Sequence, residues 1–342
     1  MRLLNTLYVT TPDSYIRLDN NTLRVEVARE SRLQVPLHHL GTVVCLGSVM
    51  VSTPLLHRLA DDGISLVMLD ANGRFKARLE GPISGNVLLR CAQHVKSGNA
   101  EFALGIARAV VAGKIGNSRQ VLMRGAREAK HDEEQAALTR AVDDLAAALR
   151  ALPSTSNLDA VRGVEGAVAR RYFESLNYLI KRDLRSAFSI DGRNRRPPRD
   201  RMNALLSFFY SMWMNDCRSA CEAVGLDPQI GFLHALRPGR AALALDLLEE
   251  FRPLADRLAL TLVNRAQLSP DDFVEREGGA VFLADDARRE VVVAFQERKQ
   301  EMLSHALLQE TIPLGITPYV QAQLLARTIR GELEGYVPFL IR

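Results

Sequence analysis

The sequence predicts an α+β protein, with a small β-rich N-terminal domain followed by a larger all-α domain. The hydrophobic pattern changes period: alternating or β-branched runs dominate to about residue 82, and helical spacing follows almost to the end. Gly81-Pro82 and Gly85-Asn86 interrupt the chain where the period changes. At 342 residues the chain is also long for a single core. The predicted segments are a β-rich domain over 1–82, a linker over 83–88 and a helical domain over 89–342.

Composition and charge are those of a soluble globular protein, with 47% hydrophobic and 25% charged residues. A net charge of +4 allows an anionic partner without requiring one. The four cysteines are scattered, which favours reduced thiols over a disulfide framework or a zinc site. The N-terminal stretch lacks a signal-peptide pattern, and Pro and Gly interrupt the long uncharged stretch from Leu33 to His57. We therefore expect a cytoplasmic protein with no membrane partner.

In the first domain, strands are predicted in NTLYVTT, SYIRLDNNTLRVEV and TVVCLG. Asp19-Asn20-Asn21 suits a hairpin turn, since Asn and Asp tolerate positive φ. A short helix is expected in STPLLHRLADDG, where Ser52 or Thr53 can cap the start, Pro54 fits the first turn and Gly63 lies past the end. ISLVMLD and RFKARLE predict further strands. No residue of this domain suggests catalysis.

From about residue 87, alanine- and leucine-rich segments predict helices, beginning with VLLRCAQHV. Proline and glycine breakers divide the remainder into further helices. One short two-stranded excursion is expected in GGAVFLADDARREVVVAF.

Glu165 is the first candidate site residue. In a helix predicted over 158–180, steps of three and four residues from Glu165 reach Val168, Tyr172 and Leu176, which places its carboxylate on the apolar face. A carboxylate in such a position must be paired, hydrogen-bonded, protonated or metal-bound. For this residue taken alone, a salt bridge to an arginine is the simpler interpretation.

The segment HALRPGRAALALDLLEEFRP, over 234–253, supplies three more candidates. Asp246 and Glu249 lie three residues apart on a predicted helix and project from the same side, whereas Glu250 is expected to face solvent. Taken alone, the segment fits an amphipathic helix with an exposed acidic side, preceded by a structural His234. Together with Glu165, however, these carboxylates and the imidazole match a donor set for Mg²⁺ or Mn²⁺. Such an ion suits phosphodiester chemistry.

An arginine-rich segment, DGRNRRPPRDR over 191–201, lies between these candidates. Its Pro-Pro pair favours an extended, exposed loop whose guanidinium groups can contact phosphates. A solvated basic loop is the alternative. Arginines here and beside the candidate ligands are predicted to bind DNA: Arg162, Arg170, Arg193, Arg195, Arg196, Arg199, Arg237 and Arg240.

Segments along nearly the whole chain resemble a known family. STPLLHRLADDGISLVMLDANGRF, RGVEGAVARRYF, RRPPRDRMNALLSFFYS and GLDPQIGFLHALRPGRAALALDLLEEFRP are similar to the CRISPR-associated endonuclease and integrase that captures new spacers, in its subtype I-C form. The Glu, His and Asp-x-x-Glu segments come in the family's order.

The resemblance implies a β domain that builds a homodimer and an α-helical catalytic domain. It implies Mg²⁺ or Mn²⁺ held by Glu165, His234 and Glu249, with Asp246 beside them as a further catalytic residue. Some members carry Asp where Glu249 stands. Two dimers would join a small companion adaptation protein and carry a DNA duplex. The 3′-hydroxyl of the captured DNA would attack a phosphodiester at the repeat boundary, and hydrolytic nicking of branched DNA would use the same site.

Two other functions fit the residues without the resemblance. A non-catalytic DNA-binding scaffold would use the acidic cluster as a structural ion-pair network. A metal hydrolase acting on small phosphate esters is also possible, although the arginine loop suits a longer polyanion.

Overall fold

The computed structural model describes residues 6–71, 73, 75–79, 81, 87–194 and 197–341, which form two compact units. The first unit takes in the described residues of Met1–Ser84 together with Leu283–Glu301 and Leu314–Ile316. The second takes in those of Gly85–Phe282, Met302–Pro313 and Thr317–Arg342. The sequence predicts one continuous helical domain over 89–342, whereas these two late segments belong to the first unit.

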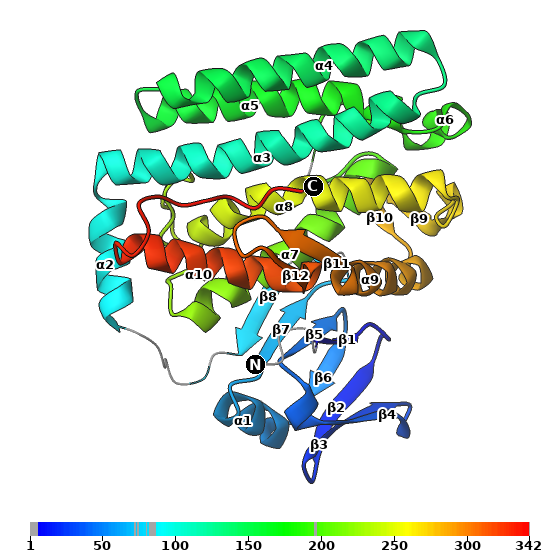
Figure 1. Ribbon diagram of the computed structural model, residues 1–342. Helices are drawn as coiled ribbons and strands as arrows, with labels where there is room; N and C mark the ends of the chain where they lie inside the picture. Colours follow the sequence, from blue (N-terminus) through cyan, green and yellow to red (C-terminus); the bar gives the residue numbers. More distant parts are fainter. Residues whose placement is uncertain are drawn as a thin grey trace. The chain divides into compact units, whose positions relative to one another are not determined.

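The first unit contains two four-stranded sheets (Figure 1). One has the order β1 (Thr6–Val9), β5 (Thr42–Leu46), β7 (Ser65–Leu69) and β8 (Phe75–Leu79), with β8 antiparallel and the others parallel. The other has the order β4 (Glu30–Pro36), β3 (Thr22–Val27), β2 (Ser14–Asp19) and β6 (Val49–Val51). The predicted hairpin is present: Asp19 pairs with Thr22, and Asn20 turns the chain with a φ of 53°.

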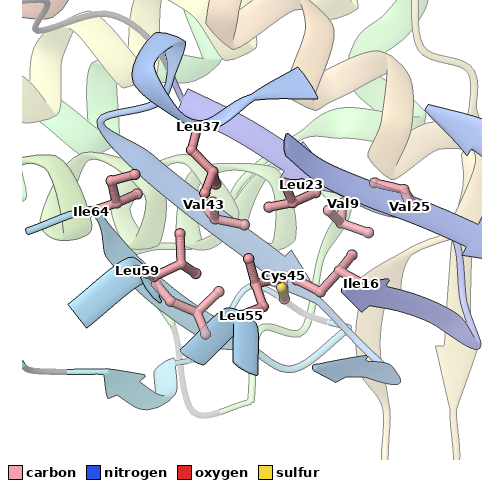
Figure 2. Packing of buried hydrophobic residues seen from close by; sticks show 11 residues of the cluster. Val9, Ile16, Leu23, Val25, Leu37, Val43, Cys45, Leu55, Leu59 and Ile64 are labelled. Atoms are coloured by element: carbon pink, nitrogen blue, oxygen red, sulfur yellow. The ribbon is translucent and has the colours of Figure 1, made fainter. Parts of the chain in front are cut away.

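Helix α1 (Thr53–Asp61) covers the core of this unit. Ser52 caps it by accepting a hydrogen bond from the Leu55 N–H, and Gly63 follows its end with a φ of 66°, as the sequence predicts. Figure 2 shows Leu55 and Leu59 of this helix facing the strand residues Ile16 and Val43. The 3-10 turn η1 (Leu37–His39) adds Leu37 to the same core.

Only the first half of the segment predicted to form two strands is a strand in the structure. Strands β9 (Phe273–Arg276) and β10 (Ala280–Leu283) pair, but the chain then forms α9 (Asp285–Gln300). The run of three valines suggests a strand, yet Ala287, Val291 and Phe295 are buried at four-residue intervals. Burial of one face of this helix therefore outweighs the β propensity of the valines.

The second unit is mainly helical and also contains two short hairpins. Its helices are α2 (Val87–Ser97), α3 (Ala100–Glu128), α4 (Asp132–Ala151), α5 (Leu158–Leu176), α6 (Arg185–Phe188), α7 (Arg201–Val224), α8 (Ala242–Asn264) and α10 (Thr317–Ile329). The second hairpin pairs β11 (Met302–His305) with β12 (Glu310–Pro313), and single 3-10 turns connect several helices. None of the helices described in either unit has the length and apolar character needed to cross a membrane.

Helix α3 is central to the second unit, because it packs against α4 and α5 on one side and α8 on another (Figure 1). Helix α8 also packs against α7, where Trp213 stacks on Phe251 with 5.2 Å between ring centroids. Phe339 of the C-terminal segment stacks on the same ring at 5.6 Å. This packing surrounds α8 and places polar residues of α3, α5 and α8 near one another.

Candidate active site

Glu165 and Glu249 meet at a single ammonium group. Glu165 lies on α5, Glu249 on α8 and Lys114 on α3. The Lys114 Nζ atom contacts Glu165 Oε1 and lies 2.6 Å from Glu249 Oε2. Two oxygens in contact with one nitrogen lie within about 6 Å of each other. The structure thus brings together two of the predicted ligands, and the ion-pair partner of Glu165 is a lysine rather than an arginine.

Glu249 is almost completely buried, with 3% of its surface exposed. Burial pushes its pKa upward, but the positive charges of Arg252 and Lys114 outweigh that effect and hold the pKa well below its usual range. Arg252 Nε donates to Glu249 Oε1 at 2.8 Å. Within the described residues, Oε2 has the Lys114 ion pair but no well-aligned hydrogen bond, so this oxygen keeps acceptor capacity.

Lys114 is buried as well, with 8% of its surface exposed. Burial lowers its pKa, but Glu249 and Glu165 more than compensate, so that the pKa is raised and the side chain is a cation. Lys114 and Arg252 together balance the two carboxylates.

Asp246 holds the loop that carries His234. Its Oδ2 accepts hydrogen bonds from the N–H groups of Phe232 at 2.6 Å and Leu233 at 3.0 Å. Its Oδ1 accepts from the His234 N–H at 2.9 Å and lies 2.7 Å from the ring Nδ1. An added Cβ at Gly231 would lie 2.7 Å from Asp246 Oδ2, so the residue at this position must be small. Asp246 therefore uses both oxygens to place the loop and the imidazole.

With Nδ1 bound to Asp246, the other ring nitrogen of His234 lies toward Glu249, with Nε2 3.9 Å from Glu249 Oε1. A carboxylate at Nδ1 favours the tautomer in which Nε2 keeps its lone pair. The imidazole is thus oriented as a metal-ligating histidine would be. Arg162 supports this arrangement, because its Nε donates to the Leu233 carbonyl at 2.8 Å.

The donor set of Glu165, His234 and Glu249 fits a hard divalent cation, since carboxylate oxygens suit Mg²⁺ and Mn²⁺ and one imidazole is compatible with Mn²⁺. Among the residues that the structure describes, the buried Glu249 Oε2 has only the Lys114 ion pair and keeps a further lone pair, which agrees with this fit. Nevertheless, no three His, Cys, Asp or Glu side chains in the described ranges are grouped closely enough to hold an ion. The Lys114 ammonium contacts both glutamates in this arrangement.

The arginines predicted to bind DNA differ in their surroundings. Arg193 is engaged in the local fold: its guanidinium donates to Asn203 Oδ1 at 2.5 Å and Ser207 Oγ at 3.0 Å and lies over the Tyr210 ring. Arg162 is occupied with Leu233, as described above, and with the Asp159 carboxylate. Arg162 thus supports the loop that carries His234, whereas Arg193 supports the local fold around α7.

The remaining predicted arginines divide by exposure. Arg170, Arg199 and Arg237 are exposed, and Arg240 is half-buried. Arg195 and Arg196 lie outside the described residues. The exposed arginines are on α5, on the segment before α7 and on the loop between His234 and α8.

The prediction that Glu250 faces solvent is wrong, since it is 0% exposed. Its carboxylate accepts hydrogen bonds from the Tyr336 hydroxyl at 2.6 Å and the Phe339 N–H at 2.7 Å, and from the Gln321 amide at 3.1 Å. Burial raises the pKa of Glu250 to about 8. The C-terminal segment covers this side of α8, which local periodicity near residue 250 cannot reveal.

Sequence reasoning missed Lys114 and Arg252. A signal for Lys114 exists in AVVAGKIGN, because Val110, Lys114 and Asn117 are spaced by four and three residues and all three are buried. A charged residue on an otherwise buried helical face requires a partner. Arg252 stands three residues after Glu249, at the spacing of an intrahelical ion pair.

Two curated relatives are similar to the chain over nearly their full length. A CRISPR-associated endonuclease Cas1 1 from Moorella thermoacetica is 55% identical over 341 residues, which cover 99% of each chain. A CRISPR-associated endonuclease Cas1 2 from Rhodospirillum rubrum is 48% identical, covering 99% of this chain and 98% of that protein.

Solved structures share the fold. A casposase bound to an integration product aligns with a TM-score of 0.83 at 20% identity, over 97% of this chain and 92% of the other. A Cas6-RT-Cas1–Cas2 complex gives a TM-score of 0.84 at 24% identity; the alignment covers 98% of this chain but 36% of the longer one. At these identities the likeness concerns the fold.

The family model described as CRISPR associated protein Cas1 matches residues 7–297, which include all four candidate ligands and most of both units. The match and the two relatives confirm the predicted family resemblance, and the chain belongs to the Cas1 family.

Proposed function

We propose that this chain is a metal-dependent DNA endonuclease and integrase of the subtype I-C kind, which inserts short foreign DNA into a CRISPR array. The proposal rests on one observation: Glu165 and Glu249, from separate helices, contact the same Lys114 ammonium, and His234 Nε2 lies 3.9 Å from Glu249 Oε1. The curated relatives are named endonucleases, and one protein of the same fold is a casposase bound to an integration product. Both findings support phosphodiester chemistry.

Glu165, Glu249 and His234 are the residues that would hold Mg²⁺ or Mn²⁺. When bound, the ion polarises a phosphoryl oxygen and lowers the pKa of the attacking 3′-hydroxyl or water. The low pKa of Glu249 keeps its carboxylate ionised at neutral pH, ready to bind a cation.

The other residues of the site orient these ligands. Asp246 fixes the ring of His234 through Nδ1 and fixes its backbone through the N–H. Arg162 restrains the same loop from α5, and Arg252 orients the Glu249 carboxylate. Asp246 is thus assigned to positioning rather than to direct metal contact.

Charge and family membership support DNA and protein partners for this chain. Arg170, Arg199 and Arg237 are the exposed arginines we assign to phosphate contacts with duplex or branched DNA. We further propose a cytoplasmic homodimer built through the β-rich domain and a small companion adaptation protein. One protein of this fold belongs to a complex that contains Cas2, which supports the companion.

The test is a Mn²⁺-dependent nicking and strand-transfer assay on branched DNA. Glu165→Gln, His234→Ala and Glu249→Gln should each abolish both reactions while the protein remains folded by circular dichroism. Glu174→Gln, an exposed change on the same helix as Glu165, is the matched control and should leave activity unchanged. Strand transfer by Glu165→Gln at the wild-type rate would contradict the proposal.

One observation favours a second function. Lys114 and Arg252 balance Glu165 and Glu249 without another cation, as they would in the structural ion-pair network of a non-catalytic DNA-binding scaffold. A scaffold would bind DNA in a salt-dependent way but show no metal-dependent cleavage. The same assay, run with Mn²⁺ and with EDTA, distinguishes the two functions.

A further inference from the structure

Lys114 occupies the position where the two candidate carboxylates face each other. Glu249 has one oxygen on Arg252, and its other oxygen contacts the Lys114 ammonium. The same ammonium contacts Glu165 Oε1. Lys114 thus links α5 and α8 directly at the site.

A divalent ion bound by both glutamates would need this space. Its oxygen ligands would lie at about 2.0–2.6 Å, whereas an ammonium group contacts carboxylate oxygens at about 2.7–2.9 Å. Two cations cannot lie between the same pair of oxygens without strong repulsion. Therefore Lys114 must leave at least one carboxylate when an ion binds there.

We propose that Lys114 is an internal counter-ion: it holds Glu165 and Glu249 together and is displaced by the divalent ion as DNA binds. The inference rests on the proposed function, because it takes these glutamates as metal ligands. Lysine suits this role because its flexible four-carbon chain lets the charge move by side-chain rotation, with the helices unchanged.

The displaced ammonium requires a new anionic partner, and a DNA phosphate supplies one. With the divalent ion added, two carboxylates would face two monovalent cations and one divalent cation, an excess of two positive charges. A phosphodiester backbone offsets that excess. Metal and DNA should therefore each strengthen the binding of the other.

The experiment measures Mn²⁺ binding to the full chain by the electron paramagnetic resonance signal of free Mn²⁺. Without DNA, Lys114→Met should bind Mn²⁺ at least tenfold more tightly than the wild type, since no ammonium competes for the carboxylates. Lys114→Arg keeps the cation and should bind no more tightly than the wild type. Adding branched DNA should tighten Mn²⁺ binding at least tenfold for the wild type and much less for Lys114→Met.

Equal or weaker Mn²⁺ binding by Lys114→Met overturns the counter-ion role. Glu165→Gln keeps this failure distinguishable from failure of the proposed function, because removing a ligand should weaken Mn²⁺ binding in either case. If the wild-type chain binds no Mn²⁺ even with DNA, both the proposed function and this inference are overturned.

A wild-type measurement covers the case in which Lys114→Met does not fold. Amine acylation followed by mass spectrometry should show Lys114 becoming at least threefold more reactive at saturating Mn²⁺. Lys130, which is exposed, serves as the internal control and should react equally with and without the ion. Unchanged Lys114 reactivity at saturating Mn²⁺ overturns the inference.

Discussion

Two carboxylates three positions apart on α8 have different tasks. Asp246 gives both oxygens to the 232–234 loop, and Glu249 faces the cations Lys114 and Arg252. Their separation of three residues puts both side chains on the same side of the helix, at the site, but it does not assign their roles. The distinction depends on which backbone groups lie beside each carboxylate.

Asp246→Asn should weaken metal binding without abolishing it. The amide retains one oxygen for the loop N–H groups but no longer fixes the His234 ring as a carboxylate does. We expect a 10- to 100-fold loss of Mn²⁺ affinity in the presence of DNA, the usual range for residues that support metal ligands. Mn²⁺ titration measures the loss, and an affinity equal to the wild type would show that Asp246 does not position His234.

Asp256 makes stability depend on pH. It is buried and accepts a hydrogen bond from the Tyr210 hydroxyl at 2.6 Å, and burial raises its pKa from 3.8 to about 6. The raised pKa means that the protonated form stabilises the fold, a contribution that is full below pH 3.8 and lost as pH rises through about 6. Relative to Asp256→Asn, the wild type should therefore lose about 2 kcal/mol of unfolding free energy between pH 4.5 and 7.5.

Urea unfolding of both proteins at several pH values measures this difference. The Asn variant stays neutral throughout and serves as the reference. A difference that does not change with pH, or that grows in favour of the wild type as pH rises, would contradict the assignment.

At the scale of elements, the segment after α10 bridges the two helices that carry Lys114 and Glu249. Asn117 on α3 donates to the Glu250 carbonyl at 2.8 Å and the Phe339 carbonyl at 3.0 Å, and accepts from the Ile341 N–H at 2.8 Å. Glu250 on α8 holds the same segment through Tyr336 and Phe339. The C-terminal segment thus stabilises the spacing of α3 and α8.

Glu250→Ala should destabilise the second unit by about 2–4 kcal/mol, because it leaves the buried Tyr336 hydroxyl and Phe339 N–H without their acceptor. Glu250→Gln keeps the shape and one oxygen acceptor, so it should cost much less. Chemical unfolding of both variants at pH 7 measures the difference. Equal stability of Glu250→Ala and the wild type would rule out this role of the segment.

The sequence predicts those parts of the fold that depend on local chemistry. Ser52 and Gly63 bound α1, and Asn20 turns the β2–β3 hairpin, because caps and turns need particular side chains or a positive φ. Local patterns do not reveal which distant segment covers a face. For that reason the structure was needed to reveal three features. They are the burial of Glu250, the helix over 285–300 and the ion pairs of Lys114 with two glutamates.

At the scale of the whole molecule, the arginine-rich surface separates into structural and exposed side chains. Arg170 and Arg237 are exposed, whereas Arg193 donates hydrogen bonds to Asn203 and Ser207. The sequence grouped these residues by charge alone. Arg193 therefore supports the local fold, and the exposed arginines are the ones we propose for phosphate binding.

Arg170→Ala and Arg237→Ala should each weaken DNA binding, since each removes one phosphate contact. The plot of the logarithm of the DNA-binding constant against the logarithm of the salt concentration should become shallower by about 1 in slope. Arg193→Ala should instead lower the thermal unfolding temperature. Fluorescence anisotropy with labelled DNA across a range of NaCl concentrations measures the slopes. An unchanged slope in both exposed-arginine variants would exclude these side chains from the DNA interface.

We propose above that one divalent ion joins Glu165, His234 and Glu249. Crystals of the full chain grown with Mn²⁺ and branched DNA would test it through the anomalous signal of the metal. One Mn²⁺ peak is expected within about 2.5 Å of a donor atom from each of the three residues, with the Lys114 ammonium moved off at least one glutamate. A Mn²⁺ peak elsewhere, with Lys114 still between Glu165 and Glu249, would contradict it.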